Sequence, residues 1–204
     1  MKCRSRTQAE RRAATIDALL EATIRALSEV GYGALTTRGV AQSAGVSQGA
    51  QQHYFPTKSA LVTAAMERLI EQLTTRAMAT PVRAESERDR ALELLDRLWE
   101  LHTLPICPAV LELYNAARTD AELAQRVSSL TRIGMESIRS VAAQFLPTCA
   151  QAPGFADFVD VATSTMRGTV VLTSVPGLAD AHPGWPRIRT MLMQLLEVST
   201  GTPV

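Results

Sequence analysis

Apolar side chains recur every three or four residues along most of the chain, a pattern that predicts amphipathic helices. The first such stripe runs from Ile16 to Leu27 and predicts a helix over about residues 9–30, with Gly31 and Gly33 as its stop. Alternation of the kind expected for a half-buried strand is not convincing anywhere in the sequence. The pattern therefore predicts an all-α fold.

Two short helices separated by a tight turn are expected next. Thr36 and Ser47 can cap helices over residues 37–44 and 48–54, because their hydroxyls accept hydrogen bonds from amides of the first helical turn. Gly45, between the two helices, permits the left-handed backbone that a tight turn requires. This arrangement is typical of a helix-turn-helix.

Longer stripes beyond residue 57 predict the helices of a larger body. The expected helices cover residues 58–78, 91–102, 108–117, 120–145, 155–173 and 188–196, separated mainly by prolines.

Composition and charge narrow the function classes. The chain is 46% hydrophobic and 20% charged, as in globular proteins and unlike disordered ones. No membrane span or secretory segment is visible, so we expect a cytoplasmic protein. Residues 1–60 carry eight Lys or Arg and four carboxylates, net +4, whereas the remainder is net −3. A basic front on an acidic body is typical of a module that binds a polyanion, although a chance fluctuation is the alternative.

The second short helix carries side chains suited to reading DNA. A major groove about 12 Å wide admits one helix, and Gln pairs with adenine edges as Arg does with guanine. That chemistry suits Gln48 and Arg38. Tyr54 and Lys58 follow at the helix end, where a hydroxyl or an ammonium can meet phosphate. The arginines at positions 4, 6, 11 and 12 are either a solvated tail or further groove contacts.

The run LTTRGVAQSAGVSQGAQQHYFPTKSAL, residues 35–61, resembles the tetracycline-repressor (TetR) family of transcriptional regulators, and the similarity begins near residue 11. The resemblance implies a three-helix DNA-binding head in residues 1–55 and a helical ligand-binding and dimerisation body in residues 56–204. It also implies a homodimer on double-stranded DNA, formed through the last two helices, so we assign the dimer interface to the apolar stripes of residues 155–173 and 188–196, which would pack as a four-helix arrangement with a second copy. By position, it implies DNA contacts by Thr36, Arg38, Ser47, Gln48, Gln52, His53, Tyr54 and Lys58.

One residue departs from the family pattern. Gln51 stands where the family usually has an aliphatic or aromatic side chain facing the core of the head. A buried amide without partners costs about 1 to 3 kcal/mol. Either Gln51 has partners or the helix is rotated, which leaves open whether Gln51 or Gln52 faces DNA.

Six side chains on interior helix faces are candidates for a small-molecule cavity with a few polar groups, although each is alternatively plain core. They are Trp99, His102, Leu111, Tyr114, Phe145 and Met166. No cofactor or metal is expected, because the histidines and the three cysteines lack the spacing of a ligand set.

We therefore expect a transcriptional repressor that a small apolar effector releases from a palindromic operator. The alternative from another class is a helical enzyme or thiol-based sensor using His102 and Cys107, although no acid is placed to orient the histidine. A third reading is a helical adaptor that keeps only protein contacts.

Overall fold

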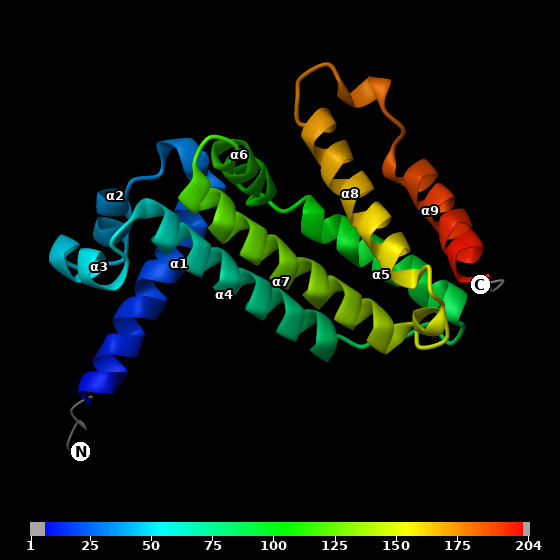
Figure 1. The fold of residues 1–204 in the computed structure, drawn as a ribbon, viewed down its shortest axis with the longest axis horizontal. Coiled ribbons are helices and arrows are strands. Elements are labelled where there is room, and N and C mark those ends of the chain that lie inside the picture. Colours follow the sequence, from blue (N-terminus) through cyan, green and yellow to red (C-terminus); the bar gives the residue numbers. More distant parts are fainter. Residues whose placement is uncertain (1–6, 202–204) are drawn as a thin grey trace. The chain divides into compact units, whose positions relative to one another are not determined.

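The computed structural model describes residues 7–201, and within them the secondary structure is helical without strands (Figure 1). The all-α prediction is confirmed. The α-helices are α1 (Gln8–Ala34), α2 (Thr37–Ser43), α3 (Gln48–Tyr54), α4 (Lys58–Ala79), α5 (Glu87–His102), α6 (Cys107–Ala117), α7 (Ala121–Phe145), α8 (Phe155–Thr173) and α9 (Trp185–Thr200). Two 3-10 turns, η1 (Cys149–Gln151) and η2 (Ala179–Ala181), complete the set.

Local capping sets helix ends that the apolar stripes alone do not mark. α5 begins at Glu87, ahead of the apolar stripe that starts at Ala91, because the Ser86 hydroxyl accepts the Asp89 amide as an N-cap. α9 continues to Thr200, where Gly201 takes the left-handed conformation (φ 64°) that ends many helices. Among the helices of residues 7–201, none is both long and apolar enough to cross a membrane.

The chain forms two compact units, and neither is continuous in sequence. The first contains the residues up to Glu71 together with Pro108–Thr131, and the second contains Gln72–Cys107 together with the residues from Arg132 onward. Helices α4 and α7 contribute to both. The division at residue 55 concerns DNA-binding and ligand-binding roles, and it stays a prediction.

The first unit contains α1, α2, α3 and the first part of α4, together with α6 and the first part of α7. Regular helix in α1 is interrupted at Gly31, whose backbone (φ 74°, ψ 176°) is open mainly to glycine. Beyond this break, the Gly33 amide donates to Glu112 Oε2 at 3.0 Å, and Lys58 Nζ donates to the Gly33 carbonyl at 3.3 Å. Side chains from α4 and α6, including Leu61 and Leu113, are buried in this unit. The end of α1 is therefore held by two segments distant in the chain.

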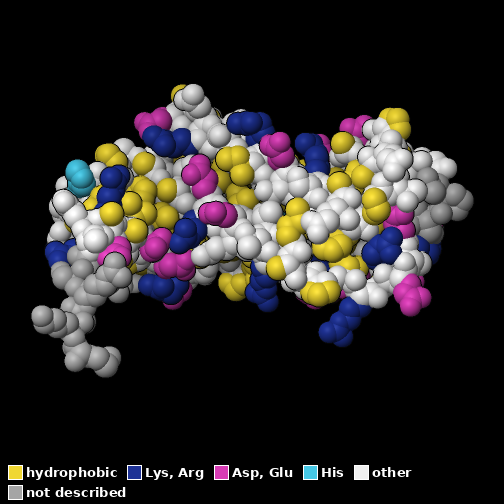
Figure 2. Space-filling view, turned by 90° about the horizontal axis from the view of Figure 1, so that it is seen from below, with side chains coloured by type: hydrophobic (Ala, Val, Ile, Leu, Met, Phe, Trp, Pro, Cys, Tyr) yellow, Lys and Arg dark blue, Asp and Glu magenta, His cyan; other side chains and the backbone are white. Residues whose placement is uncertain are grey.

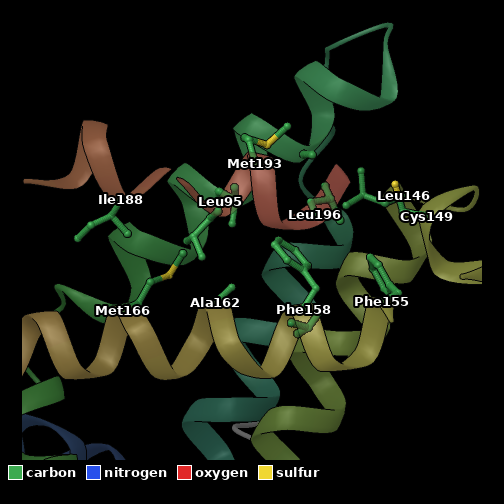
Figure 3. Close-up of a cluster of buried hydrophobic side chains, with 13 residues drawn as sticks. Leu95, Leu146, Cys149, Phe155, Phe158, Ala162, Met166, Ile188, Met193 and Leu196 are labelled. Atoms are coloured by element: carbon green, nitrogen blue, oxygen red, sulfur yellow. The ribbon is translucent and has the colours of Figure 1, made fainter. Parts of the chain in front are cut away.

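The second unit is built on packing among α5, α8 and α9. Figure 3 shows Phe155, Phe158, Ala162 and Met166 of α8 directed toward Leu95 of α5 and the α9 side chains Ile188 and Leu196. Met166 and Leu196 are fully buried. The buried part of the apolar stripes of α8 and α9 therefore packs within the chain, so Met166 and Leu196 belong to the core, whereas a dimer interface on these two helices stays a prediction.

Candidate nucleic-acid interface

Helices α2 and α3 form the predicted helix-turn-helix. The Thr36 hydroxyl accepts the Gly39 amide at 3.1 Å, and the Ser47 hydroxyl accepts the Ala50 amide at 3.2 Å, so both predicted N-caps are present. Gly45 adopts φ 66° in the turn. Each capping hydroxyl still carries a proton, which it can donate to a phosphate oxygen.

Most of the eight predicted contact residues are exposed. Thr36, Arg38, Ser47, Gln48, Gln52 and His53 are exposed, whereas Tyr54 and Lys58 are partly buried. Gln48 and Gln52 are four residues apart in α3 and therefore share one helix face. The structure thus presents two amide side chains side by side on the proposed recognition helix.

Gln51, the residue directly before Gln52 in α3, is fully buried. Its Nε2 donates to the Phe55 carbonyl at 2.7 Å, whereas its Oε1 has no hydrogen-bond partner among residues 7–201. Gln52 is exposed, so of the two glutamines it is Gln52 that is available to DNA. The buried amide is only half satisfied.

Replacing Gln51 by leucine is expected to raise the free energy of unfolding by about 1 kcal/mol, because the desolvated Oε1 disappears at the cost of a single hydrogen bond. Urea denaturation followed by circular dichroism measures the change. The matched control is Gln52→Leu, which alters an exposed side chain and should leave stability nearly unchanged. A lower stability for Gln51→Leu would mean that the bond to Phe55 outweighs the unsatisfied oxygen.

Tyr54 and Lys58 have partners inside the first unit. The Arg12 guanidinium lies 5.9 Å from the centre of the Tyr54 ring, and the His53 ring meets Tyr54 edge-on at 5.1 Å. Lys58 Nζ lies 4.4 Å from the centre of the Tyr32 ring. Burial lowers the Lys58 pKa, and the nearby Glu112 opposes this shift. Their predicted phosphate contacts stay predictions, and Arg4 and Arg6 lie outside the described residues.

Charge is mixed on the molecular surface. Figure 2 shows Lys and Arg side chains interspersed with Asp and Glu on the face that it displays, with hydrophobic side chains between them. On this face the basic residues form no single continuous patch. The candidate interface therefore consists of the exposed donors of α2 and α3.

The six candidate ligand-binding residues divide between the two units. Leu111 and Tyr114 belong to the first unit, where the Thr131 hydroxyl donates to the Tyr114 oxygen at 3.1 Å. Trp99, His102, Phe145 and Met166 belong to the second. Met166 is core, and Trp99 stacks on Trp185 with the rings 4.8 Å apart and 5° from parallel. The core role of Met166 is the alternative that the sequence had left open, whereas the stack was not predicted, because helix periodicity does not show that Trp185, which donates a hydrogen bond to Asp96, meets Trp99.

His102 and Cys107 lack the electrostatics of an activated thiol pair. Burial lowers the pKa of His102, and burial raises the pKa of Cys107. His102 Nδ1 lies 2.8 Å from the Leu98 carbonyl oxygen, and Cys107 Sγ donates to the Leu101 carbonyl at 3.2 Å. A reactive thiolate needs a depressed pKa, so the observed shift has the opposite sign.

Both described thiols are expected to react slowly in the folded protein. Burial and the charge of Glu87 raise the pKa of Cys149 to about 11, which leaves about one molecule in a thousand as thiolate at pH 8. A Cys3→Ser variant removes the thiol outside the described residues, and reaction with Ellman's reagent should then be slow until urea is added. If one thiol of the folded Cys3→Ser variant instead reacts quickly with the reagent, that result would support the thiol-sensor alternative.

Comparison with known proteins gives concordant matches. A family model described as bacterial regulatory proteins, tetR family, matches residues 19–65. The HTH-type transcriptional regulator CymR of Pseudomonas putida is 37% identical over 127 residues, which cover 62% of this chain but only 63% of CymR. The uncharacterized HTH-type transcriptional regulator Mb2936c of Mycobacterium bovis is 34% identical over 177 residues, covering 84% of this chain and 88% of that protein.

A solved structure matches over a larger share of the chain. The transcriptional regulator FadR from Bacillus subtilis, in complex with stearoyl-CoA, superposes with a TM-score of 0.62 and 14% identity. The match covers 88% of this chain and 96% of FadR. At this identity the likeness concerns the fold alone.

Proposed function

We propose that this chain, which belongs to the TetR family of bacterial transcriptional regulators, is a repressor that leaves its operator when a small molecule binds. DNA binding and regulation of transcription are the common properties of its relatives. The repressor role, the operator and the ligand response are the proposed part. In this proposal the protein works in the cytoplasm, where its DNA target lies.

The exposure of Gln48 on α3 carries the proposal. Gln48 follows the Ser47 cap directly, and Gln52 extends the same face one turn later. Seven residues of α-helix span about 10 Å, a length that fits into a major groove about 12 Å wide. In this arrangement Gln48 and Arg38 read base edges, while the hydroxyls of Thr36 and Ser47 fix the register on phosphates.

A homodimer would bring two copies of α3 to one operator. Apolar side chains remain exposed on α8 and α9, including Val161 at 47%, Met191 at 59% and Val198 at 80% of full exposure. We propose that these side chains are covered by a second copy, because a contiguous exposed apolar patch marks a surface that binds another protein. A twofold dimer predicts a palindromic site with half-sites about 34 to 36 Å apart or a multiple of that distance.

A ligand would act by binding one arrangement of the dimer better than another. The binding of stearoyl-CoA by FadR supports a small-molecule role for the helical body. Helix α4 is continuous and contributes to both compact units, so it is the natural element for transmitting a change from body to head.

The test is a gel-shift titration with the promoter region beside the protein's own gene, at two stated salt concentrations. We expect a specific complex, a steep loss of affinity with salt, and a footprint with twofold symmetry. Equal affinity for the promoter and a scrambled duplex would refute specific operator binding, and a shifted species with one chain per site would refute the dimer.

A further inference from the structure

Arg167 of α8 differs from every other partly buried arginine among residues 7–201 because it makes neither a hydrogen bond nor an ion pair with them. The others each donate to a carboxylate or a carbonyl: they are Arg68, Arg90, Arg97, Arg126, Arg139 and Arg189. A guanidinium has five N–H donors in a rigid fork that matches a carboxylate. Because Arg167 has no partner among the described residues, these donors are available to water or to an anionic ligand.

The position of Arg167 follows from the way α5 and α8 pack. Both helices start at the same end of the second unit, since Glu87 accepts amide hydrogens from Thr148 and Cys149 shortly before α8 begins. Figure 1 shows α5 and α8 leaving that end together. A helix rises 1.5 Å per residue, so Arg167 lies about 18 Å along α8, close to the level of His102 at about 22 Å along α5. The positive charge of Arg167 is correspondingly felt by His102 and Cys107.

No carboxylate of the second unit is left to neutralise Arg167 in a partly buried position. Within the described part of this unit, five acidic side chains are partly buried, and each has another partner. Glu87 binds the backbone amides before α8, Glu93 binds Arg97, Asp96 binds Trp185 and Arg189, Asp160 binds Arg139, and Glu197 binds Arg88. The groups that feel the Arg167 charge are His102 and Cys107, and burial favours the neutral form of each because it lowers the pKa of His102 and raises the pKa of Cys107.

We propose that Arg167 recognises the carboxylate of a small organic anion, and that this anion belongs to the effector class of the protein. The apolar part of such a ligand would lie beside the stacked pair of Trp99 and Trp185, because Trp99 lies three residues before His102 and therefore on the same face of α5. This inference rests on the proposed function and replaces the expectation of a purely apolar effector. Sequence reasoning missed Arg167, because a single arginine next to an apolar stripe looks like any solvated charge.

The test is calorimetric titration of the full-length protein, without DNA, with benzoate and octanoate and with their neutral counterparts benzamide and octanamide. We expect at least one carboxylate to bind and to bind more tightly than its amide. In Arg167→Gln, carboxylate affinity should fall roughly tenfold to a hundredfold, the range for a charge-assisted hydrogen bond, while amide affinity stays unchanged. Arg167→Lys keeps the charge and should retain part of the preference.

The matched control is Arg76→Gln, which removes an exposed charge from the last turn of α4 in the same unit. It should leave carboxylate binding unchanged, and melting temperatures establish that each variant is folded. The inference is overturned if neither carboxylate binds at millimolar concentration, if acids and amides bind equally, or if Arg167→Gln weakens both alike. If Arg167→Gln does not fold, the inference is tested by comparing the affinities for the carboxylate and for its amide in the wild type and in Arg167→Lys. Equal affinities for acid and amide in the wild type would overturn it.

Gel-shift measurements distinguish a failure of the proposed function from a failure of the anion site at Arg167. Carboxylate binding through Arg167 by a protein that does not recognise its promoter would refute the proposed function and leave the anion site in place. Specific promoter binding by a protein that shows no preference for carboxylates would refute the anion site and leave the proposed function in place. Binding of the anion without any change in DNA affinity would refute its role as an effector.

Discussion

Replacing Gln48 by alanine is expected to weaken binding to the operator by about 1 to 3 kcal/mol while leaving binding to scrambled DNA almost unchanged. The reason is geometric, because Gln48 is exposed in the first turn of α3 and has an amide that can bond a base edge in two places. Arg38→Ala should behave similarly at a different base pair. Fluorescence anisotropy with operator variants, at one fixed salt concentration, measures both effects.

Two controls separate base reading from general attraction. Lys58→Ala should weaken the binding of all sequences alike, as expected for loss of a phosphate contact. Gln125→Ala alters an exposed glutamine on α7 and should change neither affinity nor sequence preference. Equal losses on cognate and scrambled DNA for Gln48→Ala would contradict a base-reading role.

The second large effect is expected at the junction of α8 and α9. A Cβ atom added to Gly154 would lie 2.3 Å from the Ser199 carbonyl oxygen, which belongs to the backbone and cannot rotate away. Gly154→Ala must therefore push α8 from α9, and we expect the free energy of unfolding to fall by about 2 to 3 kcal/mol, as for other overpacked sites. Urea denaturation measures the loss.

The same variant also tests the proposed dimer, because α8 and α9 carry the exposed apolar side chains. Sedimentation should show weaker self-association for Gly154→Ala. Gly184→Ala is the matched control in the same unit, since its Cβ would meet nothing closer than Pro186 Cδ at 3.8 Å. Unchanged stability of Gly154→Ala would mean that the close approach of Ser199 relaxes without cost.

Local signals made the head predictable. Thr36, Gly45 and Ser47 act within three or four residues of their own positions, as caps and turn, so their effects can be inferred from the sequence alone. The same locality explains why Gly31 was correctly expected to stop the regular part of α1. Gln51 was recognised as a problem, and the structure resolves it as a buried, half-bonded amide.

Contacts between segments that are distant in the sequence could not be predicted. The periodicity of α8 and α9 indicates an apolar face on each, but it does not say whether that face meets the same chain or a second copy. Met166 and Ile188 pack inside the chain, so these two side chains are core, and only the exposed remainder of the two faces is left for a second copy. Lys58 similarly has a charged side chain of the kind that contacts phosphate. Its contacts with the Tyr32 ring and the Gly33 carbonyl depend on the fold and could not be predicted from the sequence.

The contact between Glu112 and Gly33 has a consequence for engineering. The first compact unit takes Pro108–Thr131 from the middle of the chain, and this segment contributes the carboxylate that receives the Gly33 amide. A chimera that grafts only residues 1–55 onto a foreign body would lose that acceptor and the buried Leu113 beside it. Exchange of operator specificity between related regulators should therefore succeed more often when the donor's α6 travels with its head.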